Sequence, residues 1–132
     1  MSGHSRWLLV LIAGGLAMSV VAQPHAADHP DRVLRHVVMY KFKDPLAPAQ
    51  VREVVDAFSA LPKKIDAIVG FEHGTNVSQE GKSEGLTHVF VVTFRDEKGR
   101  DAYLAHPAHD EYVKVVRDKR EKVIVFDYWA QR

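Results

Sequence analysis

Residues 103–113 read Tyr-Leu-Ala-His-Pro-Ala-His-Asp-Glu-Tyr-Val, and this stretch says most about the fold of the chain. His106 and His109 lie three residues apart on either side of Pro107, and Tyr103 lies upstream of both. A residue that precedes proline is disfavoured in helical geometry, so we expect His106 at a helix end. The stretch therefore predicts one helix that ends near residue 105 and another that follows Pro107.

Hydrophobic periodicity predicts the other elements. Alternation in residues 33–43 indicates a strand on which the even positions share one face. From Ala49 onward, apolar residues three and four apart indicate an amphipathic helix that Pro62 ends. Asp96 is expected to cap the helix that reaches residue 105. The remaining predicted strands are residues 68–77, 86–94 and 123–129, and the charged run 117–122 is expected to be a solvated helix end.

The predicted order β-α-β-β-α-α-β is that of a ferredoxin-like α+β fold with a four-stranded antiparallel sheet. Such a sheet carries its helices on one face and leaves the other face bare. An apolar face that is left bare on a soluble protein is normally an interface. Two such sheets packed face to face would form a dimeric α+β barrel, and the nearly continuous apolar run 86–94 agrees with burial on both faces.

The N-terminus has the features of a secretory signal. One basic residue, Arg6, precedes the uncharged run 7–22, which ends in small residues. We expect cleavage after Ala22 or a few residues later, with residues 23–32 as a polar tether. The run is shorter than the ~20 apolar residues of a spanning helix, although an uncleaved anchor is the alternative. The mature protein is therefore expected to be periplasmic or secreted and not held in a membrane.

Charge and cysteine content narrow the possible partners. Removing residues 1–22 leaves 17 basic and 17 acidic residues, a balance that argues against a nucleic-acid partner. The chain has no cysteine, so an exported domain of this size must depend on its core or on a partner subunit for stability.

Four segments in order make the chain resemble the stress-responsive A/B barrel (Dabb) family, a member of the dimeric α+β barrel superfamily. The resemblance covers residues 33–130 and is most specific at the His-Pro-Ala-His element. It implies a homodimer with a cavity between each sheet and its own helices. A plant subgroup acts as polyketide cyclases, which close a ring by aldol condensation without a cofactor. The four segments are residues 35–43, 85–94, 102–109 and 126–128.

The resemblance also suggests functional residues. By analogy with the cyclases, His109 would be a general base and Tyr103 a hydrogen-bond donor near the substrate carbonyl. Histidine titrates near neutral pH, and a tyrosine hydroxyl can stabilise a developing enolate, so this chemistry is reasonable. The expected cavity-lining residues are His36, His88, Phe58 and Phe90, with Phe58 where the cyclases have a tyrosine.

Plainer explanations stay open for each histidine. His109 could donate to a backbone carbonyl and hold the helix break, and His36 and His88 could be core histidines bonded to neighbours. Zinc accepts imidazole ligands, but the sequence has no His-x-x-x-His pair and no cysteine, so we expect no metal-ligating side chains and no cofactor. The resemblance leaves open a magnesium ion held by backbone carbonyls near residues 62–68, as in some family members. The leading interpretation is an exported homodimer that binds a small apolar or carbonyl ligand. The alternative is a cofactor-free cyclase, isomerase or lyase.

Overall fold

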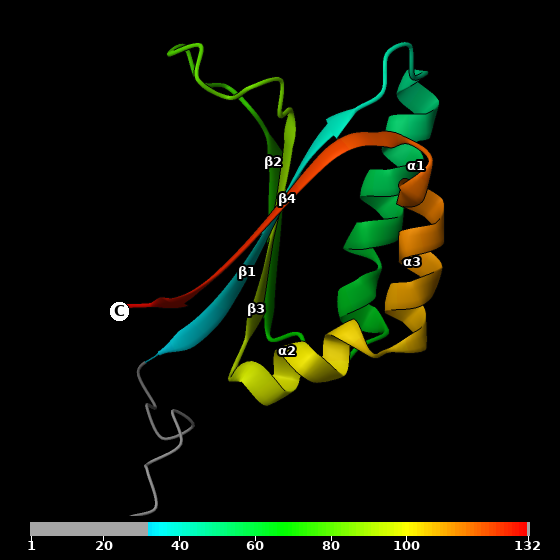
Figure 1. The fold of residues 1–132 in the computed structure, drawn as a ribbon. Coiled ribbons are helices and arrows are strands. Elements are labelled where there is room, and N and C mark those ends of the chain that lie inside the picture. The colour runs from blue at the N-terminus through cyan, green and yellow to red at the C-terminus, as the bar shows by residue number, and fades with distance from the viewer. Residues whose placement is uncertain (1–31, 132) are drawn as a thin grey trace, which may run out of the picture.

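A computed structural model describes residues 32–131 and shows three helices stacked against one side of a twisted sheet (Figure 1). The expected signal, residues 1–22, and nearly all of the expected tether lie outside the described residues. Within residues 32–131, no helix combines the length and the apolar character needed to cross a bilayer.

The elements follow the predicted order, which confirms the ferredoxin-like α+β fold. Within residues 32–131, four strands and three α-helices follow one another as β-α-β-β-α-α-β, with one short 3-10 helix, η2, after the first helix. The strands are β1 (Val33–Phe42), β2 (Gly70–Thr75), β3 (His88–Phe94) and β4 (Arg120–Ala130), and the helices are α1 (Pro48–Ser59), η2 (Leu61–Lys63), α2 (Glu97–Leu104) and α3 (Pro107–Arg117).

The sheet has the order β2-β3-β1-β4, and all neighbouring strands are antiparallel. Successive side chains of a strand point to opposite faces, so the even positions of β1 face the helices. Val38 and Tyr40 are accordingly buried, and the two register partners of Val38, Phe90 and Val125, lie on the same face. Figure 1 shows that no helix of the described chain covers the other face.

The core lies between the sheet and the two long helices α1 and α3. Val54 and Phe58 of α1 and Val116 of α3 are fully buried. The Phe58 ring stacks on Phe90 with 4.3 Å between centroids and lies 4.5 Å from the ring of Tyr112. These aromatic contacts join α1, α3 and the central strand β3 into one cluster.

Side-chain caps define the two helices on either side of the predicted break. The carboxylate of Asp96 accepts a hydrogen bond of 2.7 Å from the Gly99 amide and begins α2. The imidazole Nδ1 of His106 accepts a bond of 3.0 Å from the Ala108 amide and begins α3. A side-chain acceptor satisfies an amide that would otherwise lack a partner in the first helical turn. His106 is therefore the residue that holds the helix break.

The charged run was assigned wrongly by the sequence analysis. α3 ends at Arg117, and Arg120, Glu121 and Lys122 belong to β4. These residues pair with the end of β1, where Lys122 is the register partner of Lys41 and Glu121 forms an ion pair of 2.7 Å with Lys41. Two predicted strands are also shorter than expected, because residues 68–69, 76–77 and 86–87 lie outside β2 and β3.

Candidate functional site

A hollow of about 310 Å³ lies between the sheet and the helices. β1 and β4 form its floor, and Phe58 of α1 closes one side. The start of α3 and the end of α2 form the remaining wall. Polar groups lie toward two ends of this hollow, with apolar side chains between them.

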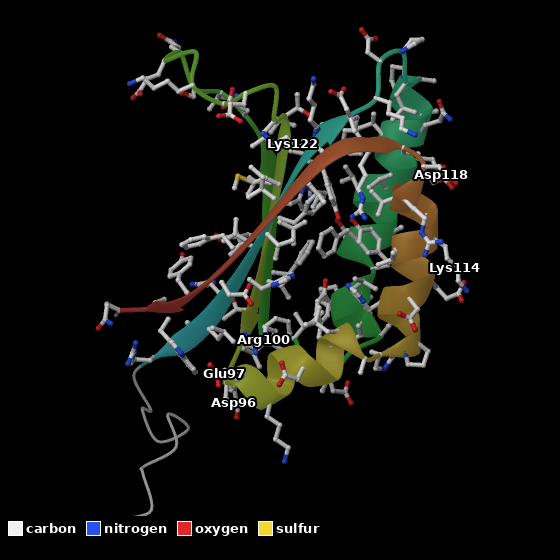
Figure 2. All side chains as sticks on the ribbon, in the orientation of Figure 1. Asp96, Glu97, Arg100, Lys114, Asp118 and Lys122 are labelled. Carbon is white, nitrogen blue, oxygen red and sulfur yellow. The ribbon has the colours of Figure 1, made fainter. Side chains whose placement is uncertain are left out.

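His36 and Asp127 form the first polar pair. They are register partners on β1 and β4, and His36 Nδ1 lies 2.6 Å from Asp127 Oδ1. Arg100 of α2, which is labelled in Figure 2, donates to the other carboxylate oxygen at 3.2 Å. His36 is buried, and its hydrogen bond to a charged, anchored carboxylate fixes the orientation of the imidazole ring.

Tyr103 lies between two histidines. Its ring centroid is 5.6 Å from that of His36, edge to face, and 4.6 Å from that of His109. Burial raises the pKa of Tyr103 well above its usual range, so the hydroxyl keeps its proton at physiological pH. A buried, protonated phenol is a hydrogen-bond donor, which is the property that an enolate-stabilising group requires.

His109 is half-buried, and its Nδ1 is shielded from solvent and has no hydrogen-bond partner in the described part of the chain. Burial lowers the pKa of His109 below its usual value, and the nearby imidazole of His36 also lowers it. Asp110 and the carbonyl of Leu104 act in the opposite direction without cancelling the effect. The ring is therefore neutral at pH 7 and available as a base.

The second polar end was not foreseen from the sequence. The hydroxyls of Tyr40 and Tyr112 lie 2.8 Å apart, both residues are buried, and Arg120 lines the hollow beside them. Alternation along β1 does place Tyr40 on the face of His36, which is the one available signal. No sequence signal placed Arg120 at the site, because the sequence analysis assigned this residue to a helix end and not to a strand.

The structure brings four of the six proposed site residues to the hollow, namely His109, Tyr103, His36 and Phe58. His88 instead lines a second pocket of about 490 Å³, at the end of the sheet under the β2–β3 loop. Phe90 is fully buried in its stack on Phe58 and is not part of the wall. In the range 32–131, no group of three or more histidine or acidic side chains is arranged to hold a metal ion.

A family model and several known proteins match most of this chain. Residues 34–130 match the family model described as "Stress responsive A/B Barrel Domain". The chain is similar to the stress-response A/B barrel domain-containing protein HS1 of Arabidopsis thaliana, with 34% identity over 72% of this chain and 87% of that protein. It is also similar to the olivetolic acid cyclase of Cannabis sativa, with 36% identity over 75% of this chain and 98% of the cyclase.

A solved structure shows the same fold. It is a dimeric ferredoxin-like protein of unknown function from Jannaschia sp., with a TM-score of 0.61 and 27% identity over 73% of this chain and 97% of that one.

Proposed function

This chain belongs to the stress-responsive A/B barrel family, and on that premise we propose that it binds a small, mostly apolar carbonyl compound in the helix-side hollow. There it moves a proton next to the carbonyl group without a cofactor. The observation that carries this proposal is the buried Nδ1 of His109, which has no partner in residues 32–131 and belongs to a side chain on the wall of the hollow beside Tyr103.

The plainer role for His109, locking the helix break, has weaker support. The cap of α3 is provided by His106, whose Nδ1 accepts the Ala108 amide. Buried polar atoms are normally hydrogen-bonded, and an exception calls for an explanation such as a catalytic role or a missing ligand. The carbonyl of Leu104 has the smallest of the four influences on the pKa of His109, and Nδ1 itself has no hydrogen-bond partner within residues 32–131.

In the proposed mechanism, neutral His109 removes a proton from the carbon next to the ligand carbonyl. The electron pair moves onto the carbonyl oxygen, where the Tyr103 hydroxyl donates a hydrogen bond to the developing enolate. Protonated His109 then returns the proton to the product. His36, held by Asp127, packs its ring against Tyr103 and fixes the phenol in place.

One of the two relatives supports an enzymatic function in general terms. The name of the Cannabis sativa relative describes a cyclase, and the Arabidopsis thaliana relative is named for a stress response. For this chain we propose only the chemistry common to cofactor-free cyclases, isomerases and lyases, which is proton transfer next to a carbonyl group. We do not propose the substrate of the Cannabis sativa cyclase.

A pH titration tests the state of His109. Following its imidazole carbon and proton signals by NMR, assigned by comparison with His109→Gln, should give a pKa below about 6.5. The rate of proton abstraction should therefore be highest at neutral pH, where His109 is neutral. It should fall as pH decreases through this pKa, because protonated His109 cannot act as a base. The unfolded state takes up this proton first, so the contribution of His109 to stability should decrease as pH falls from about 6.5 to the folded pKa. A pKa above 6.5 would contradict the proposal.

We further propose that the protein is exported, as the composition of residues 1–22 suggests. N-terminal sequencing of the mature protein should begin at Gln23 or a few residues later. Recovery of the chain with Met1 or Ser2 at its start would contradict export with cleavage.

The bare sheet face supports a homodimer. On this face Val37 pairs with Phe126 and Met39 with Ile124, and Phe126 and Tyr128 are 60% and 43% exposed. An exposed apolar surface formed by adjacent strands is typical of an interface. The Jannaschia sp. protein of the same fold is described as dimeric, and we propose that this chain is also a dimer, with the bare sheet faces of two copies packed together.

Replacing Phe126 with aspartate should therefore convert the dimer to a monomer, because the interface would bury an unpaired charge. Sedimentation velocity at micromolar concentration measures the change. The matched control is Val77→Asp, since Val77 is 87% exposed on the β2–β3 loop, away from the strands, and its replacement should leave the dimer intact. A wild-type protein that sediments only as a monomer would refute the dimer.

A further inference from the structure

We propose that the end of the hollow formed by Tyr40, Tyr112 and Arg120 binds a carboxylate group of the ligand. The proposal rests on the proposed function, since it concerns the same hollow. It specifies the ligand class as a small apolar monocarboxylate with its reacting carbonyl at the opposite end, beside Tyr103 and His109.

Arg120 is a half-buried cation that forms no salt bridge to a carboxylate in the described chain. The two basic residues nearest to it in sequence differ in this respect. Lys119 pairs with Glu53 at 3.2 Å, and Lys122 pairs with Glu84 at 2.6 Å. The nearest acidic residue in sequence on β4, Glu121, is already paired with Lys41.

Burying a charge partly, without a partner of opposite charge, costs free energy. A guanidinium can form two parallel hydrogen bonds with one carboxylate. The side chain of Arg120 lines the hollow, so a partner supplied by a ligand could reach it. With one guanidinium and no second Lys or Arg among the lining residues, this end suits a single negative charge better than a doubly charged phosphate.

The tyrosine pair adds a donor at the same place. When the hydroxyls of Tyr40 and Tyr112 bond to each other at 2.8 Å, one proton is used and the other remains free to donate. Both residues line the hollow, and Arg120 lies close enough to Tyr40 to interact with its hydroxyl. One phenol proton and the guanidinium can therefore converge on one anionic group.

The spacing of the two polar ends sets the length of the ligand. His36 and Tyr40 are four residues apart on one face of β1, which corresponds to about 13 Å of strand. Val38, Phe58 and Val113 line the hollow as well and make its middle apolar. A ligand that spans the hollow would then have an apolar body between its carboxylate and its reacting carbonyl.

A matched pair of probes tests this inference on the full mature protein. 3-Phenylpropanoate and 3-phenylpropanamide have the same shape and differ in charge. NMR titration of the backbone amides should show the acid binding at least about tenfold more tightly than the amide, with shifts at Tyr40 and Tyr112. Arg120→Gln should abolish this preference, whereas Arg120→Lys should retain part of it, because lysine keeps the charge but not the planar fork.

The control variant is Lys122→Gln, which removes a positive charge two residues along β4 from a residue that does not line the hollow. It should leave the preference for the acid unchanged. Equal binding of acid and amide in the hollow would overturn the carboxylate subsite but leave the ligand-binding hollow standing. Failure of both probes to bind would overturn both. The wild-type comparison decides the matter even if Arg120→Gln does not fold.

Discussion

Replacing His109 with glutamine is expected to slow proton exchange next to the carbonyl of a bound ketone by about 100- to 10,000-fold, the usual contribution of a general base. Glutamine has a similar reach and remains polar, but it cannot accept a proton at neutral pH. The wall of the hollow and the helix break should survive, since His106 and not His109 caps α3. The loss therefore reports on chemistry and not on folding.

Deuterium incorporation provides the measurement without knowledge of the natural substrate. The ketone 4-phenylbutan-2-one exchanges its protons next to the carbonyl with deuterated water, and NMR follows the rate with and without protein. His73→Gln is the control, because His73 is an exposed histidine on β2 that does not line the hollow. The base role fails if the wild-type protein gives no acceleration over buffer, or if His109→Gln accelerates exchange as well as wild type does.

Replacing Phe58 with alanine is expected to lower the free energy of unfolding by about 3–5 kcal/mol. Phe58 is fully buried, and its ring contacts both Phe90 and Tyr112, so truncation removes the aromatic link between α1, β3 and α3. Phe58 also lines the hollow, so the new space would join an existing cavity, and collapse of the wall would recover only part of the loss.

Urea denaturation at one fixed protein concentration measures this effect, because the stability of a dimer depends on concentration. Val77→Ala is the matched control, since Val77 is 87% exposed and its truncation should change stability by no more than about 0.5 kcal/mol. A loss below about 1 kcal/mol for Phe58→Ala would mean that this aromatic cluster does not hold the helices to the sheet.

Local chemistry made the helix break predictable. Pro107 disfavours helical geometry in His106, and Asp96 offers a side-chain acceptor, so both helix starts could be recognised from a few neighbouring residues. The charged run 117–122 shows the opposite case. Alternating lysine, arginine and glutamate suit an exposed helix end or an exposed edge strand equally well. Pairing of Lys122 with Lys41 across β1 and β4 decides in favour of the strand.

The placement of the aromatic and histidine residues at the site was only partly predictable. Alternation put His36 on one face of its strand and His88 and Phe90 on one face of another, and the family resemblance placed these faces toward the helices. Whether a residue there meets a cavity depends on where the helices lie above it. His88 pairs with Tyr40 and Thr75 near the end of the sheet, beyond the hollow, and Phe90 is covered by Phe58.

The order of the elements and the broken second helix followed from the sequence alone, because these features depend on neighbours along the chain, and the grouping of Tyr103 with His109 came from the family resemblance. The tertiary structure decided the rest of the site. His36 and Asp127 are 91 residues apart in sequence, and Tyr40 and Tyr112 are 72 apart. No local pattern specifies which distant side chains meet. Strand register joins the first pair, and the packing of α3 over the sheet joins the second.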